Sequence, residues 1–173
     1  MIDDSAIEIR WEAPSDLIGI SEVNRQAFAG PTEAALVDAL RTKTSCISLV
    51  ALSGTVVVGH ILFAPVEVVG PSSKARVAGL GPMAVRPAWQ RRGIGSQLVR
   101  DGLAECRRSG YEAGVVLGHP EYYPRFGFVP ASRLGLRCEF DAPDEAFMAQ
   151  ELRSGALSAG GGVVRYASEF SKV

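Results

Sequence analysis

The sequence predicts an α/β (α+β) protein with a mixed central sheet flanked by helices, and two patterns support this class. Segments 46–52 and 56–69 are apolar, rich in β-branched residues and joined by a Ser-Gly turn, as in an antiparallel hairpin. Further along, a strand at 75–85, a helix at 96–109 and a strand at 113–117 have the spacing of a βαβ unit, which joins parallel strands. We therefore expect an antiparallel N-terminal half and a βαβ C-terminal half.

The composition is that of an ordinary globular chain. It has 173 residues, of which 47% are hydrophobic and 21% charged, so a sizeable core is available. We expect a single domain over residues 1–173, with its central motifs at 78–130 and a C-terminal segment at 134–173. The net charge of −1 gives no general attraction to nucleic acid or to an anionic membrane, so neither is expected as a partner.

The sequence gives no indication of export, a membrane span or a metal site. The N-terminal segment is acidic, and the longest apolar stretch, 56–69, is interrupted by polar residues, so neither a signal peptide nor a membrane span is predicted. Cys46, Cys106 and Cys138 form no C-x-x-C pair, and the two histidines have no partner at metal-ligand spacing. We expect a cytoplasmic protein that binds no metal.

The N-terminal 40 residues predict a short strand followed by two helices. The strand falls at 7–11. The first helix, 15–29, has apolar residues at roughly helical spacing and Ser15 as its expected N-cap. The second helix, 32–40, has Thr32 as its expected cap.

The strand predicted at 75–85 has an unusual composition. It contains Gly79, Gly81 and Pro82, which are rare inside a central strand and indicate a bulge or the close approach of a ligand to the backbone. The helix at 96–109 gathers its apolar residues on one face, as expected for a helix that lies on a sheet.

Beyond the βαβ unit the pattern is less regular. It predicts a helical turn at 121–125, a strand that opens at 127–129, a helix at 144–152 and a last strand at 163–166. Three glycines, 160–162, precede that strand and indicate a flexible joint.

Segment 90–95, Gln-Arg-Arg-Gly-Ile-Gly, lies between a predicted strand and a predicted helix. The first N–H groups of a helix lack internal partners and, with the helix dipole, form an anion site. Glycines let a pyrophosphate approach the backbone, and Arg91 and Arg92 add positive charge. The alternative is that the glycines only make a turn. The segment is neither a complete G-x-G-x-x-G set nor a G-K-[ST] loop, and by itself it favours neither interpretation.

Two further segments accompany this one. Segment 80–87, Leu-Gly-Pro-Met-Ala-Val-Arg-Pro, precedes it, and segment 123–128, Tyr-Pro-Arg-Phe-Gly-Phe, follows it. In this order they resemble the GNAT superfamily of N-acetyltransferases, in particular its YhbS-like bacterial branch, with the motif Q/R-x-x-G-x-G/A and the ending Y-x-x-x-G-F. The resemblance is strongest over 78–130, weaker from residue 46, and limited to a pair of helices in residues 1–45.

The resemblance implies an N-acetyltransferase that moves an acetyl group from acetyl-CoA to a primary amine of a small molecule or peptide, by direct attack. Acetyl-CoA would be the cosubstrate, no metal would take part, and a homodimer is possible. Two alternatives remain open: a domain that binds or senses acetyl-CoA without turnover, and a transferase for another acyl-CoA.

The resemblance also implies a set of cofactor-binding residues. Backbone groups of the preceding strand would contact the pantetheine arm, although plain core packing explains the same apolar side chains. Backbone N–H groups of the loop would hold the pyrophosphate. The full set is Met83, Ala84, Val85, Gln90, Arg91, Arg92, Gly93, Ile94, Gly95, Ser96, His119 and Tyr122.

Two residues are expected to be catalytic. Tyr123 lies four residues before Gly127, the family position of the acid that protonates the departing thiolate, although the surrounding aromatic residues are also typical of a core cluster. Glu67 interrupts an apolar strand and is the candidate base, with a solvent-exposed strand residue as the alternative. A water chain is a further possibility for the base. A backbone N–H within 83–85 would stabilise the oxyanion.

Overall fold

The computed structural model describes residues 6–172, and the chain separates into two compact units. Strands β3 (Val56–Val69) and β4 (Val77–Val85) and helix α3 (Ile94–Arg108) each contribute residues to both units. The expectation of one domain over the whole chain stays a prediction. The described part of unit 1 comprises residues 6–62, 81–102 and 169–172, and unit 2 comprises residues 63–80 and 103–168.

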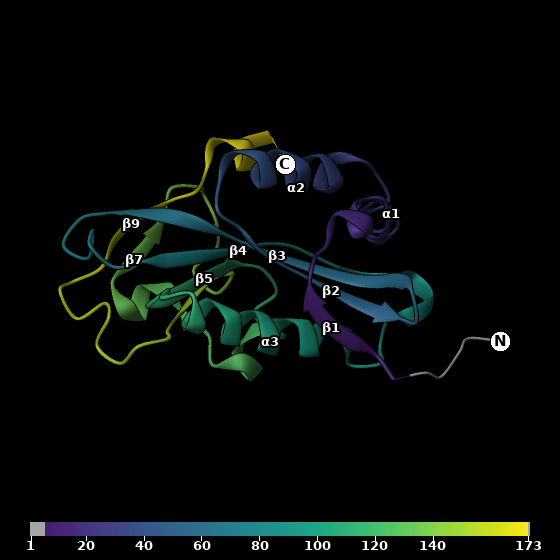
Figure 1. Cartoon of the computed structure of the whole chain (residues 1–173). Coiled ribbons are helices and arrows are strands. Elements are labelled where there is room, and N and C mark those ends of the chain that lie inside the picture. The colour runs from purple at the N-terminus through teal and green to yellow at the C-terminus, as the bar shows by residue number, and fades with distance from the viewer. Residues whose placement is uncertain (1–5, 173) are drawn as a thin grey trace. The chain divides into compact units, whose positions relative to one another are not determined.

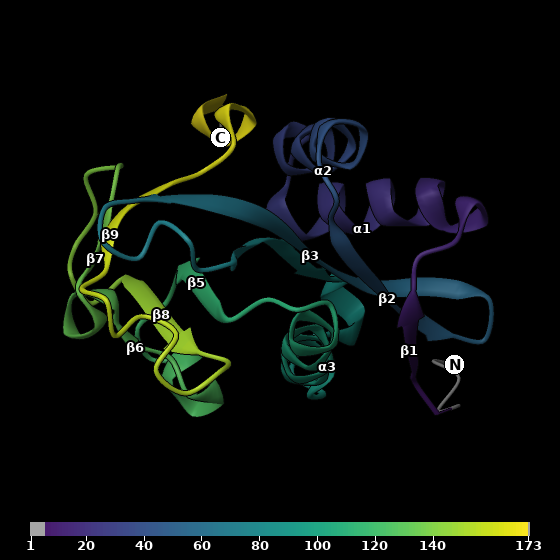
Figure 2. The ribbon, with the colours of Figure 1, turned by 60° about the vertical axis from the view of Figure 1, so that its left-hand side comes forward.

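Unit 1 consists of strands covered by helices on both faces. Strand β1 pairs antiparallel with β2, from Glu8 opposite Leu52 to Trp11 opposite Leu49. Figures 1 and 2 show α1 and α2 on one side of β2 and β3, whereas α3 begins on the other side. Besides parts of β3, β4 and α3, the unit contains β1 (Glu8–Trp11), α1 (Leu17–Phe28), α2 (Thr32–Lys43) and β2 (Ile47–Ser53).

A buried polar network lies inside unit 1. His60 on β3 is fully buried. The side-chain amide of Asn24 on α1 donates to its Nδ1 (3.3 Å), and its Nε2 lies 2.8 Å from the hydroxyl of Ser48 on β2. Because Nδ1 accepts, Nε2 must carry the proton and donate to Ser48. The neutral imidazole therefore links α1 to both strands, and burial lowers its pKa to about 3.

Unit 2 contains the parallel pair of the predicted βαβ unit. Strand β4 pairs parallel with β5, from Val77 opposite Ala113 to Gly79 opposite Val115. Strand β8 pairs antiparallel with β5 and also with β6, while β9 pairs with β3 and β7. The bounds are β5 (Ala113–Leu117), β6 (Val129–Pro130), β7 (Leu136–Cys138), β8 (Phe147–Glu151) and β9 (Gly162–Arg165).

The structure confirms the predicted fold class. The N-terminal strands pair antiparallel, and β4, α3 and β5 form the expected βαβ unit with a parallel pair. Strand β3 has the bounds predicted for segment 56–69, and β5 those predicted for 113–117. Within residues 6–172 we find no helix long and apolar enough to cross a membrane.

The largest error in the predicted elements concerns segment 144–152, which we expected to be a helix. It contains strand β8, whose first four residues are buried and which lies between β5 and β6. A short apolar run buried on both faces has no period of two, so its pattern does not separate a strand from a helix. Strand pairing decides the conformation instead.

Smaller corrections concern the helix starts and the glycine run. Ser15 is inside a 3-10 turn and α1 has Asp16 at its N-cap, whereas α2 has Pro31 at its N-cap and Thr32 as its first residue. The glycines 160–162 are not a loose joint. The N–H of Gly161 donates to the Ser72 hydroxyl (3.0 Å), and the N–H of Gly162 donates to a backbone carbonyl (3.1 Å).

Candidate functional site

The segment predicted to bind phosphate, residues 90–95 and called the phosphate loop below, joins the end of β4 to the start of α3 in unit 1. Gln90, the first residue of the loop, is tied to the end of β4, because its side-chain amide donates to the carbonyl of Val85 (3.0 Å). The guanidinium of Arg92 lies 5.1 Å from the ring centre of Trp89, in the short turn before the loop. Gln90, Arg91, Arg92 and Gly93 are all exposed residues.

The backbone of the loop takes an uncommon conformation. Arg91 has a φ of 63° and Gly93 a φ of 82°, both in the left-handed region. A residue with a side chain adopts this region at a cost of about 1 kcal/mol, so surrounding contacts must hold Arg91 there. Alternation of left-handed and right-handed residues turns successive N–H groups to one side and makes a concave anion site.

The start of α3 adds further N–H donors next to these residues. The first N–H with a helix-type bond is that of Gln97, which donates to the carbonyl of Gly93 (3.0 Å). The N–H groups of Ile94 and Gly95 come before it and have no partner inside the helix. Together with the helix dipole they favour a bound anion.

Two residues of unit 1, Arg86 and Gly59, support the segments on either side of the loop. Arg86, directly after β4, donates its Nε–H to the carbonyl of Val57 (2.7 Å) and pairs with Glu22 (3.1 Å). Gly59 on β3 leaves room for the first turn of α3, because a Cβ there would lie 3.2 Å from the Ile94 side chain.

A pocket of about 330 Å³ lies beside the loop, lined by Ile7, Ile9, Arg92, Gly93, Ile94, Gln97 and Asp101.

The predicted pantetheine segment is the end of β4. Ala84 and Val85 are buried and Met83 is half-buried, so their side chains pack in the protein. The glycines of β4 have a packing reason. A Cβ on Gly79 would lie 2.7 Å from the Val66 side chain, and one on Gly81 would lie 3.4 Å from the Leu62 side chain.

The tyrosine turn, a 3-10 helix at Tyr123–Phe126, belongs to unit 2. Tyr123 is only 7% exposed, and its ring packs edge-on against Tyr122 (5.1 Å) and Phe128 (5.9 Å). Burial raises the pKa of Tyr123 to about 12, so the phenol is neutral at physiological pH. No described residue forms a hydrogen bond with its hydroxyl.

Two further predicted residues of unit 2 are His119, which lies next to this turn, and Glu67 on β3. His119 is exposed just after β5, and its carbonyl accepts the N–H of Tyr122 (3.1 Å). The Arg125 guanidinium lies 4.8 Å from the centre of the Tyr122 ring. Glu67 is exposed on β3, opposite Arg165 of β9, a position typical of a cross-strand charge pair in solvent. Its role as a base stays a prediction.

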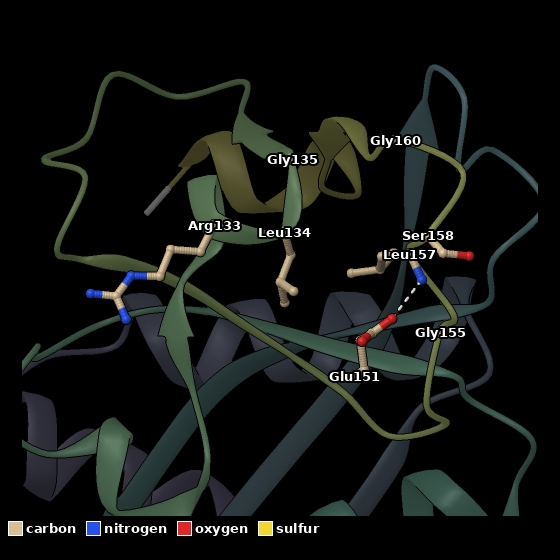
Figure 3. Close-up of a pocket in the computed structure, with 8 residues that line it drawn as sticks. All are labelled: Arg133, Leu134, Gly135, Glu151, Gly155, Leu157, Ser158 and Gly160. Carbon is tan, nitrogen blue, oxygen red and sulfur yellow. Dashed lines mark hydrogen bonds between the residues drawn. The ribbon is translucent and has the colours of Figure 1, made fainter.

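Unit 2 also contains a hollow of about 340 Å³ that includes none of the predicted residues (Figure 3). Glu151 points into it and accepts the N–H of Leu157 (2.8 Å). This carboxylate therefore fixes the loop that follows β8. Among residues 6–172 no group of three or more metal-ligating side chains occurs, and the three cysteines are free.

Comparison with known proteins identifies the family of the chain. A sequence model of the acetyltransferase (GNAT) family matches residues 8–128. The chain belongs to the GNAT acetyltransferase family. It is 36% identical to the uncharacterized N-acetyltransferase YhbS of Escherichia coli (strain K12) over 166 residues, which are 95% of this chain and 98% of the relative. The predicted family and enzyme class, an acyltransferase, are therefore confirmed.

Two solved structures of GNAT proteins cover nearly the whole chain. That of Escherichia coli YhbS in complex with CoA has a TM-score of 0.89 at 35% identity and covers 99% of this chain and 96% of that one. That of a GNAT acetyltransferase from Brucella melitensis in complex with acetyl-CoA has a TM-score of 0.75 at 34% identity, with coverages of 95% and 98%. The predicted cosubstrate is thus what GNAT relatives of this chain bind, with or without the acetyl group.

Sequence reasoning missed the residues that support the predicted ones. Trp89 stacks with Arg92, Arg86 fixes the end of β4, and Gln150 bonds to the tyrosine turn. Gln150 was hidden by the helix predicted at 144–152. A buried glutamine within an apolar run would have been the signal, since such a side chain needs a partner.

Proposed function

We propose that the protein transfers the acetyl group of acetyl-CoA to a primary amine of a small molecule or peptide. The observation that carries the proposal is the phosphate loop, whose left-handed Arg91 and Gly93 open the N-terminus of α3 to an anion. Family membership supports a CoA thioester as the source of that anion. No described atom lies within 4 Å of a Cβ built on Gly93, so the loop has space there for such an anion.

In this proposal the cofactor is bound mainly by backbone groups. The N–H groups of residues 91–96 would hold the pyrophosphate, with Arg91 and Arg92 as additional positive charges. The backbone of Met83, Ala84 and Val85 would hold the pantetheine arm. The side chain of Gln90 would not bind the cofactor, because it donates to the Val85 carbonyl and so ties the start of the loop to the end of β4.

The chemistry proposed is direct attack. An ammonium is not a nucleophile, so the amine first gives a proton to a base, either Glu67 or a water chain. The amine nitrogen then bonds to the thioester carbon, and a backbone N–H of residues 83–85 stabilises the oxyanion. The C–S bond breaks, Tyr123 protonates the departing thiolate, and the products are an amide and free CoA.

The remaining expectations are part of the same proposal. The proposed location is the reducing cytoplasm, where the three free cysteines would stay reduced. A homodimer and a bacterial setting are proposed with it.

Calorimetric titration with acetyl-CoA tests the cofactor assignment, with ATP as the control ligand. Gly93→Asp should abolish binding, because no described atom lies within 4 Å of the added Cβ and the carboxylate would occupy the anion site. Gly54→Asp is the matched control, since Gly54 has a φ of 59°, equally open surroundings and a place in the β2–β3 turn. Loss of binding in both variants, or in neither, would contradict the loop assignment.

Thiol release from acetyl-CoA then tests the reaction. A panel of spermidine, benzylamine and an unblocked lysine-containing tripeptide samples polyamine, aromatic and peptide acceptors. We expect at least one of them to accelerate thiol release and to gain an acetyl group by mass spectrometry. Tight binding of acetyl-CoA without turnover of any amine would instead favour a sensing domain.

A further inference from the structure

Gly118, the residue after β5, lies directly under the ring of Tyr123. A Cβ at this position would lie 3.1 Å from Tyr123 Cδ2 and 2.5 Å from Cε2, and the second distance is closer than a Cβ approaches another atom in folded proteins. The tyrosine ring therefore occupies the space that any other residue at 118 would fill.

Neither partner in this contact is free to move away. The N–H of Gly118 donates to the carbonyl of Ala146 (2.9 Å), which ties the backbone at 118 to the segment before β8. On its other sides the ring of Tyr123 packs edge-on against Tyr122 and Phe128. A side chain at 118 would therefore push the ring, with its hydroxyl, out of its present position.

A second residue holds the opposite end of the tyrosine turn. Gln150 on β8 is 8% exposed, and its side-chain amide donates to the carbonyl of Phe126, the last residue of the turn (3.0 Å). The turn then ends at Gly127, which has a φ of 97° and approaches the oxygen of the same amide, with an added Cβ at 3.2 Å. Loss of this donor would leave a carbonyl without its partner.

We propose that Gly118 and Gln150 are positioning residues for the acid: Gly118 sets where the Tyr123 ring lies, and Gln150 fixes the turn that carries it. The inference rests on the acid role of Tyr123 given under Proposed function. Both residues act through Tyr123 and need no contact with substrate. The position of the hydroxyl matters because a misplacement of about 1 Å can lower the rate roughly 100-fold.

The β5 region offers a matched pair of variants for a test. Gly118→Ala introduces the overlap with Tyr123, whereas Gly114→Ala, four residues earlier, adds a Cβ that lies 3.8 Å from Leu103 Cδ2. Neither glycine has a positive φ, so alanine brings no backbone strain at either site. Gln150→Met keeps the length of the side chain and removes the donor.

The first readout is spectroscopic and needs no substrate. The chain has four tyrosines, so 13Cε-tyrosine labelling gives a simple spectrum in which Tyr123→Phe assigns the signal of Tyr123. We expect Gly118→Ala to shift that signal strongly and Gly114→Ala to leave it in place. At about pH 10.5 the buried phenol should stay protonated in the parent protein and ionise in part in Gly118→Ala. An unchanged Tyr123 signal in Gly118→Ala overturns the proposal.

The second readout separates positioning from folding and from cofactor binding. Gly118→Ala and Gln150→Met should lower thiol release with the amine panel roughly 100-fold while the acetyl-CoA Kd stays within about twofold. In a Tyr123→Phe background the same changes should add almost nothing, because the group through which they act is gone. Full additivity would mean a merely structural role and overturns the proposal.

The two assignments fail in different ways. If acetyl-CoA does not bind, the proposed function fails, and the tyrosine spectra still decide whether Gly118 places the ring. If Tyr123→Phe keeps full turnover, the acid assignment is wrong and the catalytic purpose of the contact falls with it, whatever the spectra show.

Discussion

Substitution of His60 provides a quantitative check on the buried network of unit 1. The imidazole has no exposure, and burial lowers its pKa to about 3 from an ordinary value near 6.5. Between these two values the unfolded chain binds a proton at His60 that the folded protein does not, so the free energy of unfolding falls as the pH falls. Below pH 6.5 each pH unit costs about 1.4 kcal/mol, which gives about 3 kcal/mol between pH 7.5 and pH 4.5.

The neighbours of the ring support the direction of this shift. Its Nδ1 faces the amide donor of Asn24, so a second proton there would oppose a donor to a donor. The positive charge of Arg41 also lowers the pKa, as a smaller contribution than burial. Arg41 itself is paired with Glu12 at 2.7 Å.

Urea unfolding at several pH values measures this slope. The His60→Gln variant should lose the slope between pH 7.5 and 4.5, whereas His119→Gln, at an exposed site, should keep it. Carboxylates with lowered pKa contribute mainly below this window. The chain has two histidines, so proton NMR can follow each ring separately. A buried imidazole that titrates near pH 6, or an unchanged slope in His60→Gln, would refute the reasoning.

Three further predictions concern catalysis, the loop and stability. Tyr123→Phe should lower turnover roughly 100-fold or more at an unchanged acetyl-CoA Kd, as thiol release and calorimetry would show; intact turnover would place the acid elsewhere. Gly59→Ala puts a Cβ 3.2 Å from the Ile94 side chain, so the first turn of α3 should shift and calorimetry should show weaker acetyl-CoA binding; unchanged affinity would mean that the helix start is not under this constraint. Asp16→Asn removes the carboxylate that pairs with Arg10 at 2.7 Å, and urea unfolding should show a loss of about 1–2 kcal/mol, smaller below the lowered pKa of Asp16.

The elements that the sequence predicted correctly are those whose pattern is locally complete. β3 is a long run of β-branched residues after a turn, and the β4–α3–β5 unit has its glycine loop and amphipathic helix in order. The prediction of a helix at 144–152 was wrong because the conformation of β8 depends on pairing with β5 and β6, which are separate segments of the sequence. Pairing of that kind overrides local preference and leaves no period in the segment itself.

The candidate site shows the same division. The phosphate loop and Tyr123 could be predicted as site residues because each is part of a contiguous motif, and their roles stay predictions. Gly118 and Gln150 lie outside the motifs, and their significance depends on a close approach that only the folded chain creates. The glycines of β4 were expected to mark a bulge or the close approach of a ligand, and the structure adds a packing reason for Gly79 in the neighbouring Val66 side chain.

The glycines 160–162 have a consequence for how sequences of this family should be interpreted. Their φ values are 125°, 81° and 142°, and a Cβ on Gly161 would overlap the backbone of Gly135. A side chain at 161 does not fit this crossing of two chain segments, and the positive φ at 160 and 162 also favours glycine, so relatives that share the crossing should keep all three. In an evolutionary comparison these positions would look as constrained as the phosphate loop. Invariance alone would therefore mislead a search for the acceptor site, because what selection preserves here is a crossing of main chains.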